Sequence, residues 1–196
     1  MKASLNILLI QGSLRERSST FVMLHDLQQR LAALGAEAVM LDLRKTELPL
    51  YNPDVAKKGD VYQHIRPLVA AADGFVLGSP DYHGGPSGVM KNFLDHFWGE
   101  LAGKIFGYLC ASHEKGLTVM DAIRVAVRQC YGWSLPYGIS AVDGQDTGDV
   151  GDVRSETLRA RLDMMAHDLV NYGTVIRDQR LADLAGNQPT FIARHR

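Results

Sequence analysis

The chain has 196 residues, which is long enough for one hydrophobic core and short for two. Its composition, 46% hydrophobic and 22% charged, is that of an ordinary globular domain, and its formal net charge is −1. This charge gives no sign of nucleic-acid or anionic-membrane binding, so any anion site must be local. No apolar run approaches the roughly 18 residues of a membrane-spanning helix.

The hydrophobic pattern predicts alternating strands and helices. In chain order it predicts a strand at 5–10, a helix at 18–34, a strand at 37–43, a helix at 60–72, a strand at 74–78, a helix at 87–101, a strand at 104–111, a helix at 117–131, a strand at 135–141 and a helix at 155–172. The continuous apolar run at 5–10 is typical of a strand buried on both faces of a parallel sheet. Pro67 predicts a kink or a late start of the second helix.

Five strands separated by helices, with short connections, predict an α/β three-layer sandwich around a five-stranded parallel sheet. Right-handed crossovers leave few strand orders, and the flavodoxin-like order 2-1-3-4-5 fits a chain of this length. This domain is predicted to span residues 1–176. Residues 177–196 show no clear period and are predicted to be a C-terminal tail, either disordered or packed as an arm on a neighbouring subunit.

The two cysteines give no sign of a metal or redox site. Cys110 and Cys130 have neither metal-ligand spacing nor a CxxC pattern. They are interpreted as buried thiols of a cytoplasmic protein. The N-terminal apolar run is short and ends in Gln-Gly-Ser, which is typical of a first strand and not of a signal peptide. No metal ligand is assigned.

Ligands of an open α/β sheet bind beyond the carboxyl ends of the strands, where the strand order reverses. The candidate loops are therefore those after residues 10, 78 and 111. The first, residues 12–20, supplies four hydroxyl groups and two arginines at the start of a helix, which suits a phosphate group. It lacks the G-x-G-x-x-G and P-loop patterns, which favours a terminal monophosphate. The alternative is that Ser18 or Ser19 only caps the helix.

The second loop, residues 79–88, contains two prolines and three glycines and is expected to be a stiff turn with exposed main-chain groups. Such a turn can hydrogen-bond to the edge of a planar ring, and Tyr82 adds an aromatic face or a hydroxyl. His83 on its own fits a solvent-facing loop residue better than an acid or base. No nucleophile–base pair for hydrolysis is evident.

The third loop, residues 111–116, is expected to close the far side of a ring site through Ser112 and Gly116. Its charged residues, Glu114 and Lys115, are interpreted as solvated. The helix at 87–101 carries an apolar stripe wider than one core face needs. Either this helix is fully buried within one domain, or part of the stripe packs against a second subunit.

Two segments make the chain resemble the NAD(P)H-dependent FMN reductase family. They are Gly12-Ser13-Leu14-Arg15 and residues 79–95, which end in Lys91-Asn92-Phe93-Leu94-Asp95. The family carries a G-S-x-R-x-x-S phosphate loop and a P-x-Y-x-x-x-x-S/P-G-x-L-K-N-x-L-D segment at about this separation. Residues 48–52 also resemble the loop after the second strand in many relatives. The resemblance covers roughly residues 5–172.

The resemblance implies a set of FMN-binding residues. Those implied to hold the phosphate are Ser13, Arg15, Ser18, Ser19 and Thr20. Those implied to line the isoalloxazine, largely through main chain, are Pro80, Asp81, Tyr82, His83 and Gly84, with Ser112 in the third loop. The chain departs from the family pattern at His83, where relatives often carry Asn, and in the third loop, which has one glycine where many relatives have several.

The resemblance also implies a reaction, hydride transfer from NAD(P)H to flavin N5 and then reduction of a small-molecule acceptor. Since the cofactor carries this chemistry, no catalytic side chain is assigned. The alternatives are an FMN-containing reductase of quinones, azo compounds or chromate, a flavodoxin-like electron carrier, and an FMN-less regulatory module. Carriers are typically strongly acidic, and a charge of −1 argues against one. A homodimer or homotetramer is implied, with no nucleic-acid or membrane partner.

Overall fold

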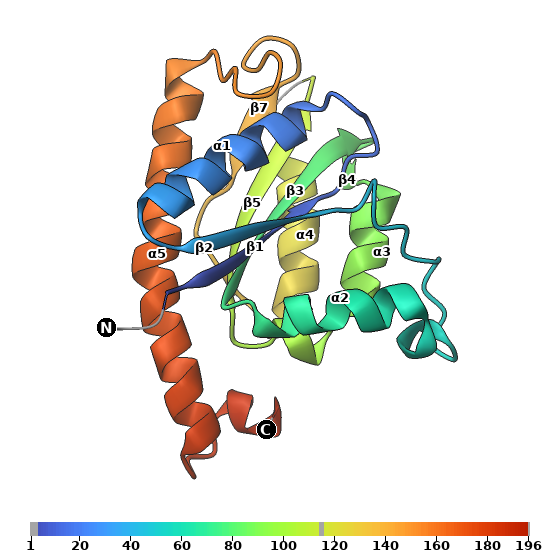
Figure 1. Cartoon of the computed structure of the whole chain (residues 1–196), viewed down its shortest axis with the longest axis vertical. Coiled ribbons are helices and arrows are strands. Elements are labelled where there is room, and N and C mark those ends of the chain that lie inside the picture. The colour runs from blue at the N-terminus through green and yellow to red at the C-terminus, as the bar shows by residue number, and fades with distance from the viewer. Residues whose placement is uncertain (1–3, 114–115, 196) are drawn as a thin grey trace.

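Strands and helices alternate in the computed structural model, which describes residues 4–113 and 116–195 (Figure 1). The strands are β1 (Asn6–Gln11), β2 (Glu37–Asp42), β3 (Gly74–Tyr82), β4 (Gly85–Pro86), β5 (Ile105–Ser112), β6 (Trp133–Ser134) and β7 (Ile139–Val142). The helices are α1 (Ser19–Ala33), α2 (Asp60–Ala71), α3 (Gly88–His96), α4 (Leu117–Gln129) and α5 (Glu156–Ala185), with short 3₁₀ helices at Ala56–Lys58, Gly99–Leu101 and Phe191–His195. The loop charges predicted at Glu114 and Lys115 lie outside the described residues.

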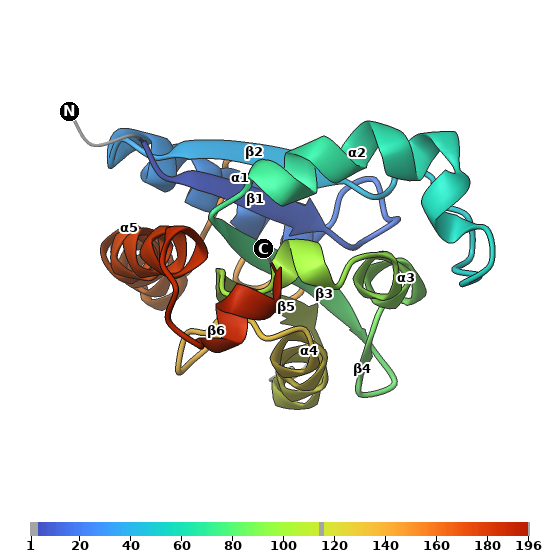
Figure 2. The ribbon, with the colours of Figure 1, turned by 90° about the horizontal axis from the view of Figure 1, so that it is seen from below.

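The sheet separates two hydrophobic cores, which confirms the predicted three-layer sandwich. Along β1, Ile7 and Leu9 face the core under α1 and α5, whereas Leu8 and Ile10 face the core under α2, α3 and α4. This alternation follows from the two-residue period of a strand, and it explains why the first strand reads as a continuous apolar run. Figure 2 shows the two helical layers on either side of the twisted sheet.

The strand count and order differ from the prediction of five strands in the order 2-1-3-4-5. Within the described residues the sheet has seven strands in the order β2-β1-β3-β5-β6, while β4 pairs with β3 and β7 with β5. The predicted fifth strand at 135–141 is broken, because both β6 and β7 pair with β5 at different points along it. Leu135 still donates its N–H to the Phe106 carbonyl, but Pro136 has no N–H to continue the ladder.

The second predicted loop is also partly sheet. β3 continues to Tyr82 instead of ending at Gly78, and Ser79 and Pro80 pair with Cys110 and Ala111 of β5. The chain then turns back, and β4 pairs antiparallel with the last two residues of β3. The second predicted loop, which contains Tyr82, is therefore a hairpin at the carboxyl edge of the sheet.

The helix predicted at 87–101 ends early, because α3 stops at His96 and Phe97 is extended. In that conformation the Phe97 ring reaches the core and stacks on Tyr62, with ring centroids 5.3 Å apart. Most of the apolar stripe is buried within the chain, and Trp98 remains exposed. The second helix, α2, runs from Asp60 through Pro67 without the predicted late start.

The last helix extends well beyond the predicted end at residue 172. α5 reaches Ala185, so residues 177–185 are helical, and the 3₁₀ helix at Phe191–His195 passes beneath β5 and β6 (Figures 1 and 2). Ile192 is buried near Gly103, and Arg180 pairs with Asp73 at 3.0 Å. Much of the segment predicted to be a disordered tail or an arm therefore has helical structure. The role of this segment as an oligomer arm stays a prediction.

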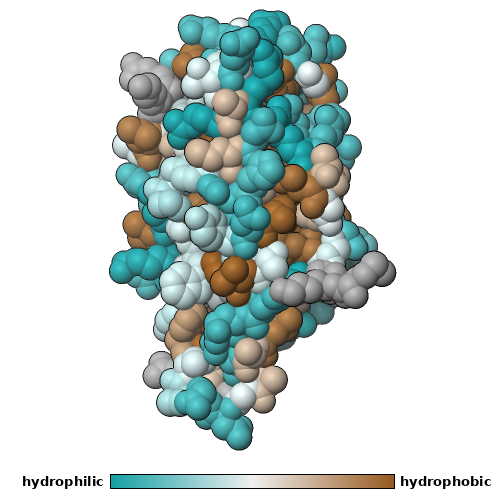
Figure 3. Space-filling model, turned by 90° about the vertical axis from the view of Figure 1, so that its left-hand side faces the viewer, coloured by the Kyte–Doolittle hydropathy of each residue, from teal (hydrophilic) through white to brown (hydrophobic). Residues whose placement is uncertain are grey.

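The side of the molecule that carries α5 is of mixed polarity. Figure 3 shows apolar residues in separate patches among hydrophilic ones on this side. Met164, Tyr172, Val175 and Leu181 are the large apolar or aromatic side chains that α5 leaves exposed. Among the described residues, no helix combines the length and the apolar character that crossing a bilayer requires.

Candidate functional site

A cavity of about 90 Å³ lies where the carboxyl ends of β1, β3, β5 and β7 meet. Its lining contains every predicted site residue except His83 and Gly84: Ser13, Arg15, Ser18, Ser19, Thr20, Pro80, Asp81, Tyr82 and Ser112. Ala111, His113 and Asp143 also line it and were not predicted. The three predicted loops thus come together in space, as expected for parallel strands that end at one edge of a sheet.

The first loop is fixed against the neighbouring strand β3. Gly12 donates its N–H to the Gly78 carbonyl at 2.8 Å. The Gln11 amide accepts the Ser13 N–H and donates to the Ser13 carbonyl, so the turn is held from within. A side chain at Gly12 would bring Cβ to 2.8 Å from both the Gly78 carbonyl oxygen and Met90 Cε. This close approach explains why the position holds glycine.

Three hydroxyl groups of the first loop donate no hydrogen bond to any described residue. Ser18 caps α1 by accepting the Phe21 N–H at 3.1 Å, which confirms the capping role but uses only the oxygen lone pair. Ser13 Oγ accepts the Arg15 N–H in the same way. Thr20 is fully buried, and among the described residues its Oγ1 has no hydrogen-bond partner. A buried unpaired hydroxyl is costly unless a ligand satisfies it. The part of the first loop that lines the cavity therefore suits a ligand that accepts hydrogen bonds. We call this part the cradle; it consists of Ser13, Arg15, Ser18, Ser19 and Thr20.

The fourth hydroxyl of the first loop, that of Ser19, is hydrogen-bonded to Asp143 in the turn after β7. Ser19 Oγ donates to one oxygen of the Asp143 carboxylate, and Arg15 Nη1 donates to the other at 2.7 Å. The Ser19 hydroxyl, followed by Arg15, lowers the pKa of Asp143. Thr147 in turn donates to Ser19 Oγ at 2.6 Å.

Asp143 and Thr147 were not predicted as site residues, because they lie outside the three loops beside the point where the strand order reverses. The usable signal was the predicted end of the last strand at residue 141. The carboxyl end of every parallel strand reaches the same edge, so the next residues belong near the site.

The second loop lines the cavity with the end of β3 and not with the tip of its hairpin. His83 and Gly84 are the two central residues of the hairpin, with φ of 58° and 80°. Positive φ at both positions is the requirement of a type I′ turn, for which Asn-Gly is the preferred pair. Asp81 Oδ1 accepts the Gly84 N–H at 2.7 Å and closes the turn. His83 therefore occupies a position selected for backbone conformation.

Replacing His83 with asparagine is expected to leave stability unchanged or slightly higher, whereas valine should cost about 1–2 kcal/mol because a β-branched residue resists positive φ. Urea unfolding of both variants measures the difference. Asparagine is the matched control, since it removes the same imidazole and keeps the turn. Equal stability of the two variants would contradict this account of the hairpin.

The segment after the hairpin ties the loops together. Ser87 donates its N–H to Ser79 Oγ at 2.9 Å, and its own hydroxyl donates to the Gly12 carbonyl. The same Ser87 Oγ accepts the Met90 N–H and caps α3. One buried serine thus links the second loop, the first loop and the start of α3.

The Lys-Asn part of the family-like motif lies outside the cavity lining. Asn92 accepts the Tyr51 N–H at 2.8 Å and donates to the carbonyls of Leu48 and Pro49. Lys91 pairs with an aspartate one turn along the exposed face of α3. The most specific part of the motif therefore holds the loop after β2 on α3.

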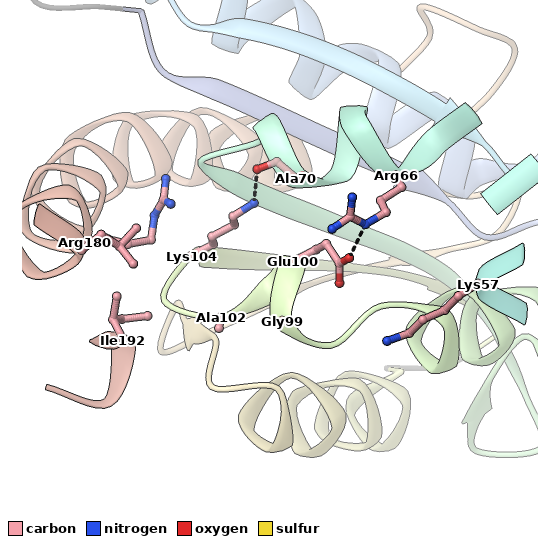
Figure 4. Close-up of a pocket in the computed structure, with 10 residues that line it drawn as sticks. Lys57, Arg66, Ala70, Gly99, Glu100, Ala102, Lys104, Arg180 and Ile192 are labelled. Atoms are coloured by element: carbon pink, nitrogen blue, oxygen red, sulfur yellow. Dashed lines mark hydrogen bonds and ion pairs between the residues drawn. The ribbon is translucent and has the colours of Figure 1, made fainter. Parts of the chain in front are cut away.

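A larger cavity, about 420 Å³, lies at the opposite end of the sheet, beneath the amino end of β5 (Figure 4). Most of its charged side chains already have partners within the protein, and Arg180 pairs with Asp73. Arg66 contacts Glu100 at 2.9 Å, and Lys104 Nζ donates to the Val69 and Ala70 carbonyls near the end of α2. These contacts belong to the packing of α2, and we place the functional site at the smaller cavity, where the strand ends converge.

The stability of the protein is expected to rise with pH above neutrality because of Lys104. Burial, and then the charge of Arg180, lowers the pKa of Lys104 from 10.5 to about 7. Between these values the unfolded chain binds more protons than the folded one, so the free energy of unfolding increases with pH. Replacing Lys104 with methionine should flatten this rise.

Urea unfolding at about pH 7 and about pH 9 measures the effect of Lys104 on the pH dependence of stability. Lys91→Met is the matched control, since Lys91 is exposed and should leave the pH dependence as it is in the wild type. An unchanged slope in Lys104→Met would contradict the assignment.

The cysteines are free thiols and offer no nucleophile. Burial raises the pKa of Cys110 to about 12, so its thiol stays protonated. Across the described parts of the chain, no three His, Cys, Asp or Glu side chains gather as a metal site would require.

The fold and the site define a class of protein, a parallel α/β sandwich with an anion-suited cradle at its carboxyl edge. Residues 5–147 match the family model described as NADPH-dependent FMN reductase. An NADPH azoreductase of Bacillus sp. (strain OY1-2) is 31% identical over 123 residues, which cover 59% of this chain and 68% of that protein. The NADPH-dependent FMN reductase ArsH of Shigella flexneri is 26% identical over 186 residues, or 90% and 71% of the two chains.

Solved structures agree on the fold. FerB, a flavoenzyme NAD(P)H:(acceptor) oxidoreductase from Paracoccus denitrificans, has a TM-score of 0.73 at 18% identity, over 86% of this chain and 97% of that chain. The chain therefore belongs to the NADPH-dependent FMN reductase family and has a flavodoxin-like fold. It is an NAD(P)H-dependent oxidoreductase with FMN and NAD(P)H as its cofactors.

Proposed function

We propose that the loop after β1 holds the FMN phosphate and that the protein reduces FMN with NAD(P)H. The observation that carries this proposal is the set of hydroxyl protons on Ser13, Ser18 and Thr20 that no described residue accepts, beside Arg15 at the start of α1. A helix N-terminus favours negative charge, and hydroxyl and guanidinium donors bind phosphate oxygens. A volume of about 90 Å³ suits this end of the flavin, because sites for whole cofactors are several times larger.

The residues proposed to line the flavin ring are those at the end of β3, together with Ser112 at the end of β5. The same cavity is lined by the cradle and by Pro80, Asp81 and Tyr82. The Tyr82 side chain is exposed, so a ligand in the cavity could contact it. His83 and Gly84 act through the turn that fixes this strand end. When bound, FMN supplies the hydride acceptor, and the residues of the chain bind and orient it.

The acceptor that we favour is an azo compound or another small oxidant such as a quinone or chromate. The support for azo compounds is that the Bacillus relative bears the name NADPH azoreductase. A flavodoxin-like carrier of electrons between proteins is disfavoured, since such carriers dock basic partners through strong negative charge and this chain has a net charge of −1.

We further propose a homodimer or homotetramer in the cytoplasm, with residues 1–176 as the FMN-binding domain and the C-terminal segment available to a neighbouring subunit. The exposed Trp98 beyond α3 supports a second subunit, and the free cysteines support a reducing compartment. Sedimentation as a monomer at micromolar concentration would contradict the assembly.

The test of the proposed function is the absorbance of the purified chain with added FMN, followed by NADPH or NADH under anaerobic conditions. Uptake of FMN and bleaching by either nicotinamide are expected, with recovery of the oxidised spectrum on addition of a quinone or azo dye. Absence of flavin uptake would point to the FMN-less module. Uptake without bleaching would point to the electron carrier.

A further inference from the structure

An acidic side chain occupies part of the proposed phosphate cradle. The two carboxylate oxygens of Asp143 accept hydrogen bonds from Ser19 Oγ and from Arg15 Nη1, the latter at 2.7 Å. Both donors line the cavity with the free hydroxyl groups, and Asp143 itself lines it. The carboxylate therefore makes contacts that an incoming phosphate oxygen would make.

Ser19 differs from the other hydroxyls of the cradle in how its proton is used. A serine hydroxyl has one proton, and that of Ser19 is given to Asp143 while Thr147 donates to the same oxygen. Ser19 can donate to a ligand only after this bond breaks. Arg15 has five N–H donors and can be shared, but its positive charge is already offset by Asp143.

We propose that Asp143 competes with the FMN phosphate for Ser19 and Arg15 and so keeps FMN binding weak and reversible. This inference rests on the proposed function and extends it, because FMN that is released readily behaves as an exchangeable substrate and not as a permanently held group. The competition persists at neutral pH, since Ser19 and Arg15 lower the pKa of Asp143 and keep the carboxylate charged. Riboflavin lacks the phosphate and escapes the competition.

The test compares dissociation constants for FMN and riboflavin, measured by quenching of flavin fluorescence in the full chain. Asp143→Asn keeps the shape and removes the charge, so FMN should bind about tenfold more tightly, because a like charge next to the phosphate is gone. Riboflavin binding should not change. The gain should shrink as salt is added, because screening weakens the removed repulsion.

The matched control is Asp149→Asn. Asp149 lies between β7 and α5, as Asp143 does, and its carboxylate is 3.7 Å from the guanidinium of Arg17. Both of these side chains are almost fully exposed, and neither lines the cavity. The same loss of charge should therefore leave FMN affinity unchanged. Asp143→Ala is a second variant without the charge and should also tighten FMN binding, while Asp143→Glu should stay weak.

Three outcomes would overturn the proposal. Unchanged or weaker FMN binding in both Asp143→Asn and Asp143→Ala would show that Asp143 instead positions Arg15 for the phosphate. Equal tightening in Asp149→Asn would show a general charge effect. Failure of the wild type and of every variant to bind either flavin would overturn the proposed function itself, which the riboflavin measurement distinguishes from the first two results.

Discussion

Replacing Thr20 with valine is expected to weaken FMN binding at least about tenfold, because a hydrogen bond to a charged group is lost. The same change should stabilise the flavin-free protein by about 1 kcal/mol, since it removes a buried hydroxyl without a partner and keeps the shape. Thr20 is fully buried in the cavity lining, and no described residue pairs with its Oγ1. Higher stability of the flavin-free protein together with weaker FMN binding would show that the Thr20 hydroxyl binds FMN.

Thr190→Val is the matched control for Thr20→Val. Thr190 Oγ1 is also buried without a partner among the described residues, but it lies between α5 and the C-terminal 3₁₀ helix. The control should gain stability and leave FMN affinity unchanged. Urea unfolding and fluorescence quenching measure the two quantities. FMN affinity equal to that of the wild type in Thr20→Val would remove Thr20 from the proposed site.

Replacing Gly12 with alanine is expected to cost about 2–3 kcal/mol of stability and to abolish FMN binding, because the added methyl group has no room. The new Cβ would lie 2.8 Å from the Gly78 carbonyl oxygen, which belongs to the backbone of the central strand β3. The loop must move away, and the bond from Gly12 N–H to Gly78 would be lost with it. The phosphate cradle moves with the loop.

Gly88→Ala provides the control for Gly12→Ala on the same side of the molecule. Gly88 is the first residue of α3, its φ is not positive, and a Cβ there meets nothing within 4 Å. Alanine should therefore be neutral or stabilise by up to about 1 kcal/mol. Thermal unfolding with and without FMN measures both variants. Wild-type stability of Gly12→Ala would contradict the close approach of the first loop to β3.

The convergence of the predicted loops on one cavity could be foreseen because the loops follow strands with strong apolar patterns. The apolar runs at β1, β3 and β5 indicate three parallel strands, and parallel strands end at one edge of a sheet. Ser13, Tyr82 and Ser112 were therefore expected to lie close together, and all three line the cavity. Asp143 was not predicted because it follows β7, whose loop is not one of those beside the point where the strand order reverses. His83 was assigned to the ring site from the family pattern, and its positive φ became evident only in the hairpin.

The elements that the sequence missed depend on contacts with distant residues. α5 continues past residue 172 with exposed Val175 and Leu181, so its apolar pattern gives no period to follow. Its last turns are anchored by Arg180, which reaches Asp73 before β3. Helical length of this kind is decided by tertiary packing, which local propensity does not report.

The sequence by itself determined that the chain is a parallel α/β sandwich with loops suited to phosphate at its carboxyl edge. It did so because buried strands, helix caps and glycine turns leave local patterns that need no partner to be recognised. Only the tertiary structure decided which hydroxyl protons are free. That property depends on Asp143, which lies 124 residues from Ser19 along the chain and adjacent to it in the fold.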